Sequence, residues 1–245
     1  MIKIKLGVAV SVLYSITTGM LSFSTTALEK REVYVQASAG SFNDAAINQL
    51  FAQQSALKMP VNFSGTPSHT FEQAHNTNTW AFSAVENSTI PGKLVDATIT
   101  AVQQYRIVDV IGFITTPIEM CALMHIDDVN NNKEISVIAS HPAALKQIKG
   151  WKAKVGVPEL AVPNGTSAAA ERVSKRLLGI GGVAVGSCVL VETYPNLSVI
   201  AKGIQDNKHN ETSFLLMKVN KRTEMITISQ ARKALSHAIT LGRAL

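Results

Sequence analysis

The sequence has little of what would place it in a specialised class of protein. It contains two cysteines among 245 residues, which excludes a small disulfide-dense scaffold. Charged residues make up 16% of the chain and aromatic residues 6%, whereas 46% of the residues are hydrophobic, and this balance excludes a disordered chain. After the N-terminus, no apolar run is long enough for an unambiguous membrane span. The composition therefore predicts a globular protein whose length suits one large domain or two small ones.

Motifs of several well-known chemistries are also absent. There is no C-x-x-C pair, no H-E-x-x-H and no Cys/His cluster, so the sequence gives no support for a metal site. It has no G-x-S-x-G elbow and no G-K-[S/T] loop. The glycines at 179–182 follow a predicted helix and precede a strand, the reverse of a dinucleotide-binding loop, so they indicate a helix end. We therefore expect no metal, no cofactor and, given the few aromatic residues, no nucleic-acid partner.

The first residues have the layout of a secretory signal. Lys3 and Lys5 precede an uncharged, mostly apolar run over 6–23, and small residues follow at 24–27. A positive start, an apolar middle and a small-residue exit are typical of a signal peptide, here cleaved after Ala27. The alternative is an uncleaved membrane anchor, because the apolar run is slightly long. We expect a signal peptide over 1–27, export to the periplasm and no stable membrane span after cleavage.

The two cysteines leave two states open. In an exported protein, Cys121 and Cys188 would meet an oxidising compartment in which a disulfide is permitted. Each lies in an apolar stretch, which is equally typical of a buried free thiol. The sequence does not supply the separation of the two Cα atoms, on which a bridge depends.

Strand-like and helix-like stretches alternate along the chain. The predicted strands are 33–37, 80–85, 106–125, 135–139, 160–162, 182–185, 197–201 and 213–219. The predicted helices begin at Ser41 and Pro67 and cover 96–105, 143–154, 166–178 and 229–241. This alternation predicts an α/β fold with mostly parallel sheets. In such folds ligands bind at the carboxyl ends of strands, where loops lead into helix N-termini.

Three of the predicted strand-to-helix junctions carry small hydroxyl side chains. They are at Ser41, at Ser140 and at Thr166 with Ser167. Unpaired N–H groups at a helix start, together with the helix dipole, form a ready anion site. Simple N-capping accounts for each junction as well. The formal charge of +6, with an excess of basic residues over 146–176 and 202–243, is the second indication of a small anionic ligand.

The same segments, taken in order, resemble the catalytic domain of prephenate dehydratase. The motifs that carry the resemblance are G-S-F at 40–42, V-E-N-S at 85–88 with Gly92, S-H-P-A-A-L-K-Q at 140–147, T-S-A-A at 166–169 and N-E-T-S-F at 210–214. The resemblance implies a two-lobed α/β fold, similar to type II periplasmic binding proteins, with the site in the cleft between the lobes. The implied divisions are lobe 1 over 28–110 and 203–225, lobe 2 over 111–202 and a C-terminal helix over 226–245.

The resemblance also implies a reaction and a set of site residues. The family converts prephenate to phenylpyruvate in phenylalanine biosynthesis, with loss of carbon dioxide and of the ring hydroxyl. By resemblance, Thr212 and Asn87 would be catalytic, with Thr212 donating a hydrogen bond to the departing hydroxyl. The implied substrate-binding residues are Ser41, Glu86, Ser140, Gln147, Thr166, Ser167 and Phe214. A prephenate-like anionic metabolite would be the ligand, and a homo-oligomer is implied.

The sequence departs from the family pattern in ways that keep three functions open. The arginine of the family's T-R-F motif is Ser213 here, which removes a bidentate partner for a carboxylate, and Lys146, Lys218 or His209 could replace it. The segment after 219 is too short for the regulatory ACT domain of many members, so no such regulation is expected. The first function is an exported prephenate dehydratase. The second is a non-dehydrating lyase resembling prephenate decarboxylases, against which the retained Thr212 counts. The third is a non-catalytic periplasmic binding protein for a small anionic solute.

Overall fold

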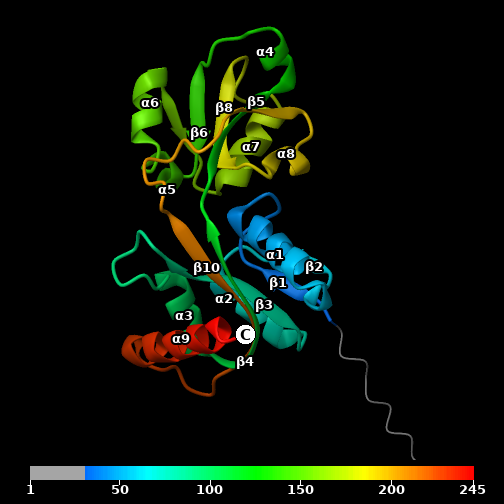
Figure 1. The fold of residues 1–245 in the computed structure, drawn as a ribbon, viewed down its shortest axis with the longest axis vertical. Coiled ribbons are helices and arrows are strands. Elements are labelled where there is room, and N and C mark those ends of the chain that lie inside the picture. The colour runs from blue at the N-terminus through cyan, green and yellow to red at the C-terminus, as the bar shows by residue number, and fades with distance from the viewer. Residues whose placement is uncertain (1–30) are drawn as a thin grey trace, which may run out of the picture.

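The computed structural model describes residues 31–245, and the predicted signal peptide over 1–27 lies outside the described residues. The chain forms two lobes, each built on a five-stranded sheet, which stand one above the other in Figure 1. Nowhere in residues 31–245 is a helix long and apolar enough to cross a membrane. The two-lobed α/β fold that the resemblance implied is confirmed.

The first lobe contains both ends of the described chain. Its strands are β1 (Val33–Val35), β2 (Val61–Phe63), β3 (Trp80–Asn87), β4 (Tyr105–Pro117) and β10 (Glu211–Lys221), in the order β2-β1-β3-β10-β4. Its helices are α1 (Phe42–Gln53), η1 (Ser55–Leu57), α2 (Pro67–Asn76), α3 (Asp96–Gln104) and α9 (Ile228–Arg243). Side chains alternate across β10, so that Phe214 packs with α1 on one face of the sheet and Leu215 packs with α3 and α9 on the other.

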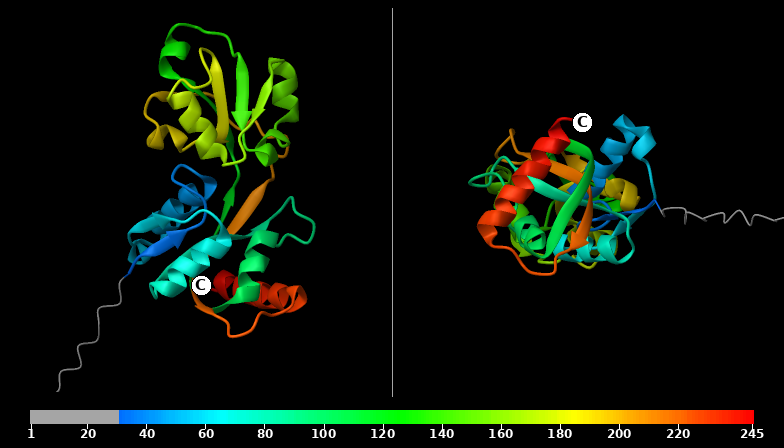
Figure 2. Two further views of the ribbon diagram at one scale, coloured as in Figure 1. Left: turned by 180° about the vertical axis from the view of Figure 1, so that it is seen from behind. Right: turned by 90° about the horizontal axis from the view of Figure 1, so that it is seen from below.

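The second lobe is formed by the middle of the chain. Its strands are β5 (Met120–His125), β6 (Val137–Ser140), β7 (Glu159–Ala161), β8 (Gly182–Ser187) and β9 (Leu197–Ala201), in the order β7-β6-β8-β5-β9. Its helices are α4 (Ile126–Asn130), α5 (Pro142–Leu145), α6 (Lys149–Val155), α7 (Thr166–Ser174) and α8 (Leu190–Thr193). Two passages of the chain join the lobes, one leading from β4 into β5 and the other leading back into β10 (Figure 2).

The sheets are mixed, so the prediction of mostly parallel sheets was wrong. β1 is parallel to β2 and β3, and β6 is parallel to β7 and β8. β10 is antiparallel to β3 and β4, and β5 is antiparallel to β8 and β9. The antiparallel strands are those that receive the chain as it passes from the other lobe. Their direction is therefore set by the passage between lobes and not by a helical crossover.

The boundary between the lobes and the extent of one helix also differ from the prediction. The predicted lobe boundary at 110/111 lies inside β4, which pairs with β10 as far as Pro117, so residues 111–117 belong to the first lobe. The helix predicted over 143–154 is divided into α5 and α6. The division has a tertiary cause, because the Asp206 carboxylate accepts hydrogen bonds from the N–H groups of Lys149 and Gly150 at 2.8 and 2.9 Å and so starts a second helix. In addition, β2 is not among the predicted strands.

A disulfide settles the state of the two cysteines. Cys121 on β5 is bonded to Cys188, which directly follows β8, with their Cα atoms 5.1 Å apart. The bridge joins adjacent strands of the second lobe close to the passage from β4. It therefore restricts the unfolded chain and fastens the end of the lobe that faces the cleft.

A buried acidic residue stabilises the opposite end of the second lobe. Asp128 in α4 is 4% exposed and accepts hydrogen bonds from Arg176 at 2.7 Å and from the N–H of Gly181 at 2.9 Å. Burial by itself raises the pKa of Asp128, but the bonds from Arg176 and Gly181 outweigh it and hold the pKa below its ordinary value. The ionised form is therefore the one that the folded protein favours.

We predict that Asp128→Asn lowers the free energy of unfolding by about 2 kcal/mol near neutral pH. Because the folded pKa is depressed, the carboxylate stabilises the fold above its unfolded pKa of about 3.9, and this stabilisation is lost as the pH falls through the folded pKa. The difference between the wild type and the variant should therefore shrink as the pH is lowered from about 5 toward 2. Urea unfolding across this range measures it, with the exposed Asp109→Asn as control. A difference that does not change with pH would contradict the ionic role.

A glycine allows the two lobes to approach each other closely. Gly40, in the loop before α1, has a φ of +74°, and a Cβ atom there would lie 2.5 Å from Leu190 Cδ2 and 2.8 Å from Thr193 Oγ1 on α8. The first lobe thus contacts the second at a position where a side chain does not fit.

We predict that Gly40→Ala lowers the melting temperature and moves the lobes apart, because the added methyl group must displace α8. Small-angle scattering should then show a larger radius of gyration. Gly65→Ala is the matched control, since Gly65 has a φ of +76° but open space around its Cβ position. It should show only the backbone strain of about 1–2 kcal/mol. Equal effects of the two substitutions on melting temperature and radius of gyration would refute the close interlobe contact.

Candidate functional site

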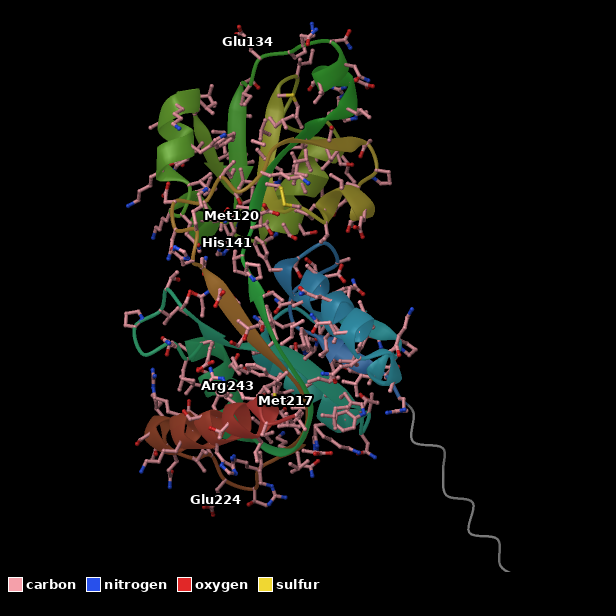
Figure 3. The ribbon with its side chains drawn as sticks, viewed as in Figure 1. Met120, Glu134, His141, Met217, Glu224 and Arg243 are labelled. Atoms are coloured by element: carbon pink, nitrogen blue, oxygen red, sulfur yellow. A yellow bond between two sulfur atoms is a disulfide. The ribbon has the colours of Figure 1, made fainter. Side chains whose placement is uncertain are left out.

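A cavity of about 550 Å³ lies where the two lobes meet. Its walls come from the start of α1 and the ends of β3 and β10 in the first lobe, and from α5, the start of α7 and the chain around Met120 in the second. Figure 3 shows Met120 and His141 at the edge of the second lobe that faces the first. The site is therefore positioned by the contact between lobes, at the ends of the strands.

A chain of side-chain hydrogen bonds runs along this cavity from one lobe to the other. In the second lobe, Gln147 accepts a bond from Asn210 Nδ2 at 2.8 Å through its side-chain oxygen. Asn210 Oδ1 in turn accepts a bond from Asn87 Nδ2 at 2.8 Å. The same Asn87 nitrogen donates to Thr212 Oγ1, also at 2.8 Å. Each amide is thus fixed in orientation by its neighbours, and the donors start from Asn87, which donates toward Asn210 on one side and toward Thr212 on the other.

Strand pairing brings these groups together. Thr212 on β10 is directly opposite Asn87 on β3, and Asn210 precedes Thr212 by two residues, which places both on the same side of the chain. The Asn87 oxygen accepts the N–H of Thr89 at 2.9 Å, so it also closes the turn after β3. Both amide hydrogens and the side-chain oxygen of Asn87 are therefore engaged in hydrogen bonds, which fix the orientation of this side chain.

The Thr212 hydroxyl is left with a proton to donate. Thr212 is 7% exposed and lines the cavity. Its oxygen accepts from Asn87, so its own hydrogen must point elsewhere, and no acceptor for it exists within residues 31–245. A hydroxyl oriented in this way can donate a hydrogen bond to a ligand oxygen in the cavity.

The start of α1 provides free backbone donors on one side of the cavity. Ser41 caps the helix by accepting the N–H of Asp44 at 3.3 Å, as predicted, and the Asp44 carboxylate accepts the N–H of Gly40 at 2.8 Å. The first intrahelical bond runs from Ala45 to Ser41. The N–H groups between these positions have no partner in the helix, so this helix start can receive an anionic group.

The start of α7 provides the same kind of donors from the other lobe. Its N-cap is Gly165, which has no side-chain capping bond, and its first intrahelical bond runs from Ala169 to Gly165. The N-capping interpretation is therefore wrong for Thr166 and Ser167. Ser167 Oγ instead donates to the carbonyl of Ala39 at 2.8 Å, which ties the second lobe to the first. Two helix N-termini thus face one cavity, where their dipoles favour negative charge.

The structure brings most of the predicted site residues to this cavity. Those that line it are Ser41, Asn87, Gln147, Thr166, Ser167, Thr212 and Phe214. Phe214 is buried, stacks on Phe82 with ring centroids 5.3 Å apart, and forms part of the apolar wall. These residues, distant in the sequence, therefore line one cavity, and their roles in binding and catalysis stay predictions.

Two predicted site residues do not reach the cavity. Ser140 is fully buried and donates to the carbonyl of Val185 at 2.5 Å, so it joins β6 to β8 instead of binding a ligand. Glu86 precedes Asn87 on β3 and therefore points to the other face of the sheet. There it accepts a hydrogen bond from Arg243 of α9. Glu86 is directed away from the cavity because neighbouring residues of a strand face opposite ways, and Ser140 because its hydroxyl joins two strands of the second lobe.

The lining of the cavity has few ionisable side chains. No Asp, Glu, Lys or Arg side chain is among its lining residues, and His141 is its one titratable group within the described part of the chain. His141 Nδ1 accepts the N–H of Ala143 at 3.2 Å, which leaves Nε2 as the ring nitrogen that can donate. The proposed replacement cations Lys146, Lys218 and His209 do not line the cavity, so that expectation was wrong. Within residues 31–245 there is no cluster of three or more His, Cys, Asp or Glu side chains that could hold a metal ion.

Sequence reasoning missed several lining residues. Asn210 has a signal in the sequence, because it lies two residues before Thr212 on the same strand face. His141 and Asn43 occupy helix starts that were recognised, but their side chains were not assigned to the site. The apolar wall residues Ile118 and Met120 lie in the passage between lobes, which a sequence pattern does not locate.

The family model for prephenate dehydratase matches residues 33–222. No curated protein sequence matches the chain significantly. Among solved structures, the chain is similar to a prephenate dehydratase from Arthrobacter aurescens in complex with L-Phe, with a TM-score of 0.61, 20% identity and coverage of 80% of this chain and 61% of that one. It is also similar to GqqA, described as a quorum-quenching acylase (TM-score 0.57, 22% identity, 80% and 66% coverage). For the prephenate dehydratase from Staphylococcus aureus subsp. aureus Mu50 the values are 0.56, 18%, 79% and 68%.

These structural similarities concern the fold, and the chain spans 66% and 61% of the lengths of GqqA and of the Arthrobacter protein. The family assignment rests on the family model, which covers nearly all of the described residues and all of the motifs around the cavity. The chain therefore belongs to the prephenate dehydratase family.

Proposed function

We propose that this protein is a lyase of the prephenate dehydratase type, which converts prephenate to phenylpyruvate. The observation that carries the proposal is the Thr212 hydroxyl, which Asn87 orients so that its hydrogen is free to point into the cavity between the lobes. The family match over 33–222 and the amide chain through Asn210 and Gln147 support it.

The reaction demands positioning and one hydrogen-bond donor. The bond between the ring and its carboxylate breaks, and its electron pair enters the ring as carbon dioxide leaves. The bond between the ring and its hydroxyl breaks at the same time, and the departing hydroxide takes a proton from solvent to become water. A hydrogen bond from Thr212 to that oxygen stabilises the charge that develops on it. Because a Thr hydroxyl is a poor acid, its contribution is this hydrogen bond in a preorganised site and not full proton transfer.

The substrate's carboxylates would be held by backbone groups. The free N–H groups at the starts of α1 and α7 face the cavity from the two lobes, and anions bind favourably at such positions. Nε2 of His141 is a further donor at the same edge. In this arrangement oriented dipoles replace a guanidinium in the binding of the anion.

The position of Ser213 explains how the family's arginine can be absent. Ser213 lies opposite Glu86 on β3 and its hydroxyl is 2.9 Å from Thr115 Oγ1 on β4, on the sheet face that points away from the cavity. An arginine at 213 would therefore lie beside Glu86. In this chain the Glu86 carboxylate forms its ion pair with the guanidinium of Arg243 instead.

Export to the periplasm is part of the proposal. The N-terminal pattern over 1–27 supports it. The disulfide between Cys121 and Cys188 supports it as well, because such bonds persist in oxidising compartments.

We predict that the purified protein forms phenylpyruvate from prephenate, as identified by chromatography and mass spectrometry of the products. Thr212→Ala should lower kcat by about a hundredfold or more with little change in melting temperature, and Thr212→Ser should retain most of the activity. Ser213→Ala, on the opposite face of β10, is the matched control and should leave kcat unchanged. A decarboxylated, non-aromatic alcohol as product would instead identify a non-dehydrating lyase. Binding of prephenate without turnover would identify a binding protein.

We predict that Arg243→Ala lowers the free energy of unfolding by about 0.5–1 kcal/mol, because the Arg243 side chain of this ion pair is half exposed. Adding Ser213→Arg to that variant should restore the loss, since position 213 lies beside Glu86. Chemical unfolding of the two single variants and the double variant measures the coupling between the sites. If Ser213→Arg has the same effect with and without Arg243, the two positions do not share Glu86.

A further inference from the structure

One amide in the wall of the cavity has no partner. Asn43 lies in the first turn of α1, lines the cavity and is 9% exposed, so it is nine-tenths buried. Its side-chain oxygen is buried and accepts no hydrogen bond from any described residue. A buried acceptor without a donor is uncommon in proteins, because burial removes its bonds to water without replacing them.

The contrast with three other amides that line the cavity shows that Asn43 is exceptional. Asn87, Asn210 and Gln147 form a continuous chain in which each side-chain oxygen accepts a bond. None of these amides can turn toward a ligand without breaking a bond that it already makes. Asn43 breaks no bond when it turns. A half-turn about Cβ–Cγ exchanges the two ends of the amide and brings the oxygen to the side of the nitrogen.

The surroundings of Asn43 define the kind of ligand that it can meet. The free N–H groups at the start of α1 lie next to it along the chain and favour a carboxylate. The apolar side chains of Phe42, Met120 and Phe214 line the same cavity and suit an aromatic or cyclic body. An oxygen without a partner requires a ligand that carries an O–H or N–H donor in addition to its carboxylate.

We propose that Asn43 determines the specificity of the cleft by accepting a hydrogen bond from a hydroxyl or amino group of a small aromatic or cyclic carboxylic acid. This role rests on the proposed function, because it takes the cleft to be the ligand site. It goes further by naming the substituent that the ligand carries. Acids of the same size that lack a donor leave the Asn43 oxygen unpaired and bind more weakly.

Three ligands with the same ring and carboxylate test this role. They are 3-phenyllactate, which adds a hydroxyl, phenylalanine, which adds an amine, and 3-phenylpropionate, which adds neither. Titration calorimetry with the wild-type protein should show at least one of the donor-bearing acids binding about tenfold more tightly than 3-phenylpropionate. Whichever donor-bearing acid shows this preference identifies the donor as a hydroxyl or an amine.

Asn43→Leu separates a ligand contact from a structural role. The variant should lose the preference for donor-bearing acids while its melting temperature stays equal to or above that of the wild type, because an unpaired buried amide has been removed. Asn48→Leu, an exposed position on the same helix, is the matched control and should keep the preference. Equal binding of all three acids by the wild type, an equal loss for all three in Asn43→Leu, a fall in its melting temperature, or no binding at all would overturn the role of Asn43.

The outcomes distinguish a failure of the Asn43 role from a failure of the proposed function. Turnover of prephenate together with equal binding of the three acids rejects the role of Asn43 alone. A donor preference that depends on Asn43, in a protein that does not turn over prephenate, rejects the dehydratase reaction alone.

Discussion

The hydrogen bonds that Asn87 donates to Asn210 and Thr212 hold the whole site in its arrangement. Through Asn210 they connect the first lobe to Gln147 in the second, and they orient the hydroxyl of Thr212, which lines the cavity. Both hydrogens of one amide are committed, so Thr212 can only accept from it and must donate into the cleft. The same hydrogen-bond network therefore links the two lobes and orients the Thr212 hydroxyl.

The lining of the cavity, in which the described residues place no Asp, Glu, Lys or Arg side chain, is consistent with this design. Where water is excluded by a bound ligand, fixed dipoles such as helix N-termini and oriented hydroxyl groups act with less screening. The lysines and arginines among residues 31–245 do not line the cavity, so the formal charge of +6 does not describe the site. Selectivity among ligands then depends on which hydrogen bonds each ligand forms with the cavity wall. A single unpaired amide such as Asn43 can therefore have a large effect on which ligand binds.

Part of the fold and of the site could be predicted from the sequence because it depends on local patterns. The cap at Ser41, the strand at β3 and the closing helix α9 follow from neighbouring residues, and the ordered motifs identified Asn87 and Thr212. The directions in which the side chains of Glu86 and Ser140 point could not be predicted from local patterns. Which face of a strand meets the cavity depends on where the second lobe lies, and this is set by pairing between distant strands.

Other features depend on contacts between distant parts of the chain. The break between α5 and α6 is caused by Asp206, which is separated from Lys149 by 57 residues in the sequence. The disulfide depends on the register of β5 and β8, which places Cys121 opposite Gly186, close to Cys188. No periodicity in the sequence encodes either contact.

A crystal structure of the protein with bound phenylpyruvate tests the central claim most directly. The account predicts that the ligand occupies the cavity between the lobes, with a ligand or water oxygen within hydrogen-bond distance of Thr212 Oγ1 and the bond from Asn87 intact. A ligand bound elsewhere, or a Thr212 hydroxyl that donates to a protein acceptor in the complex, would contradict it.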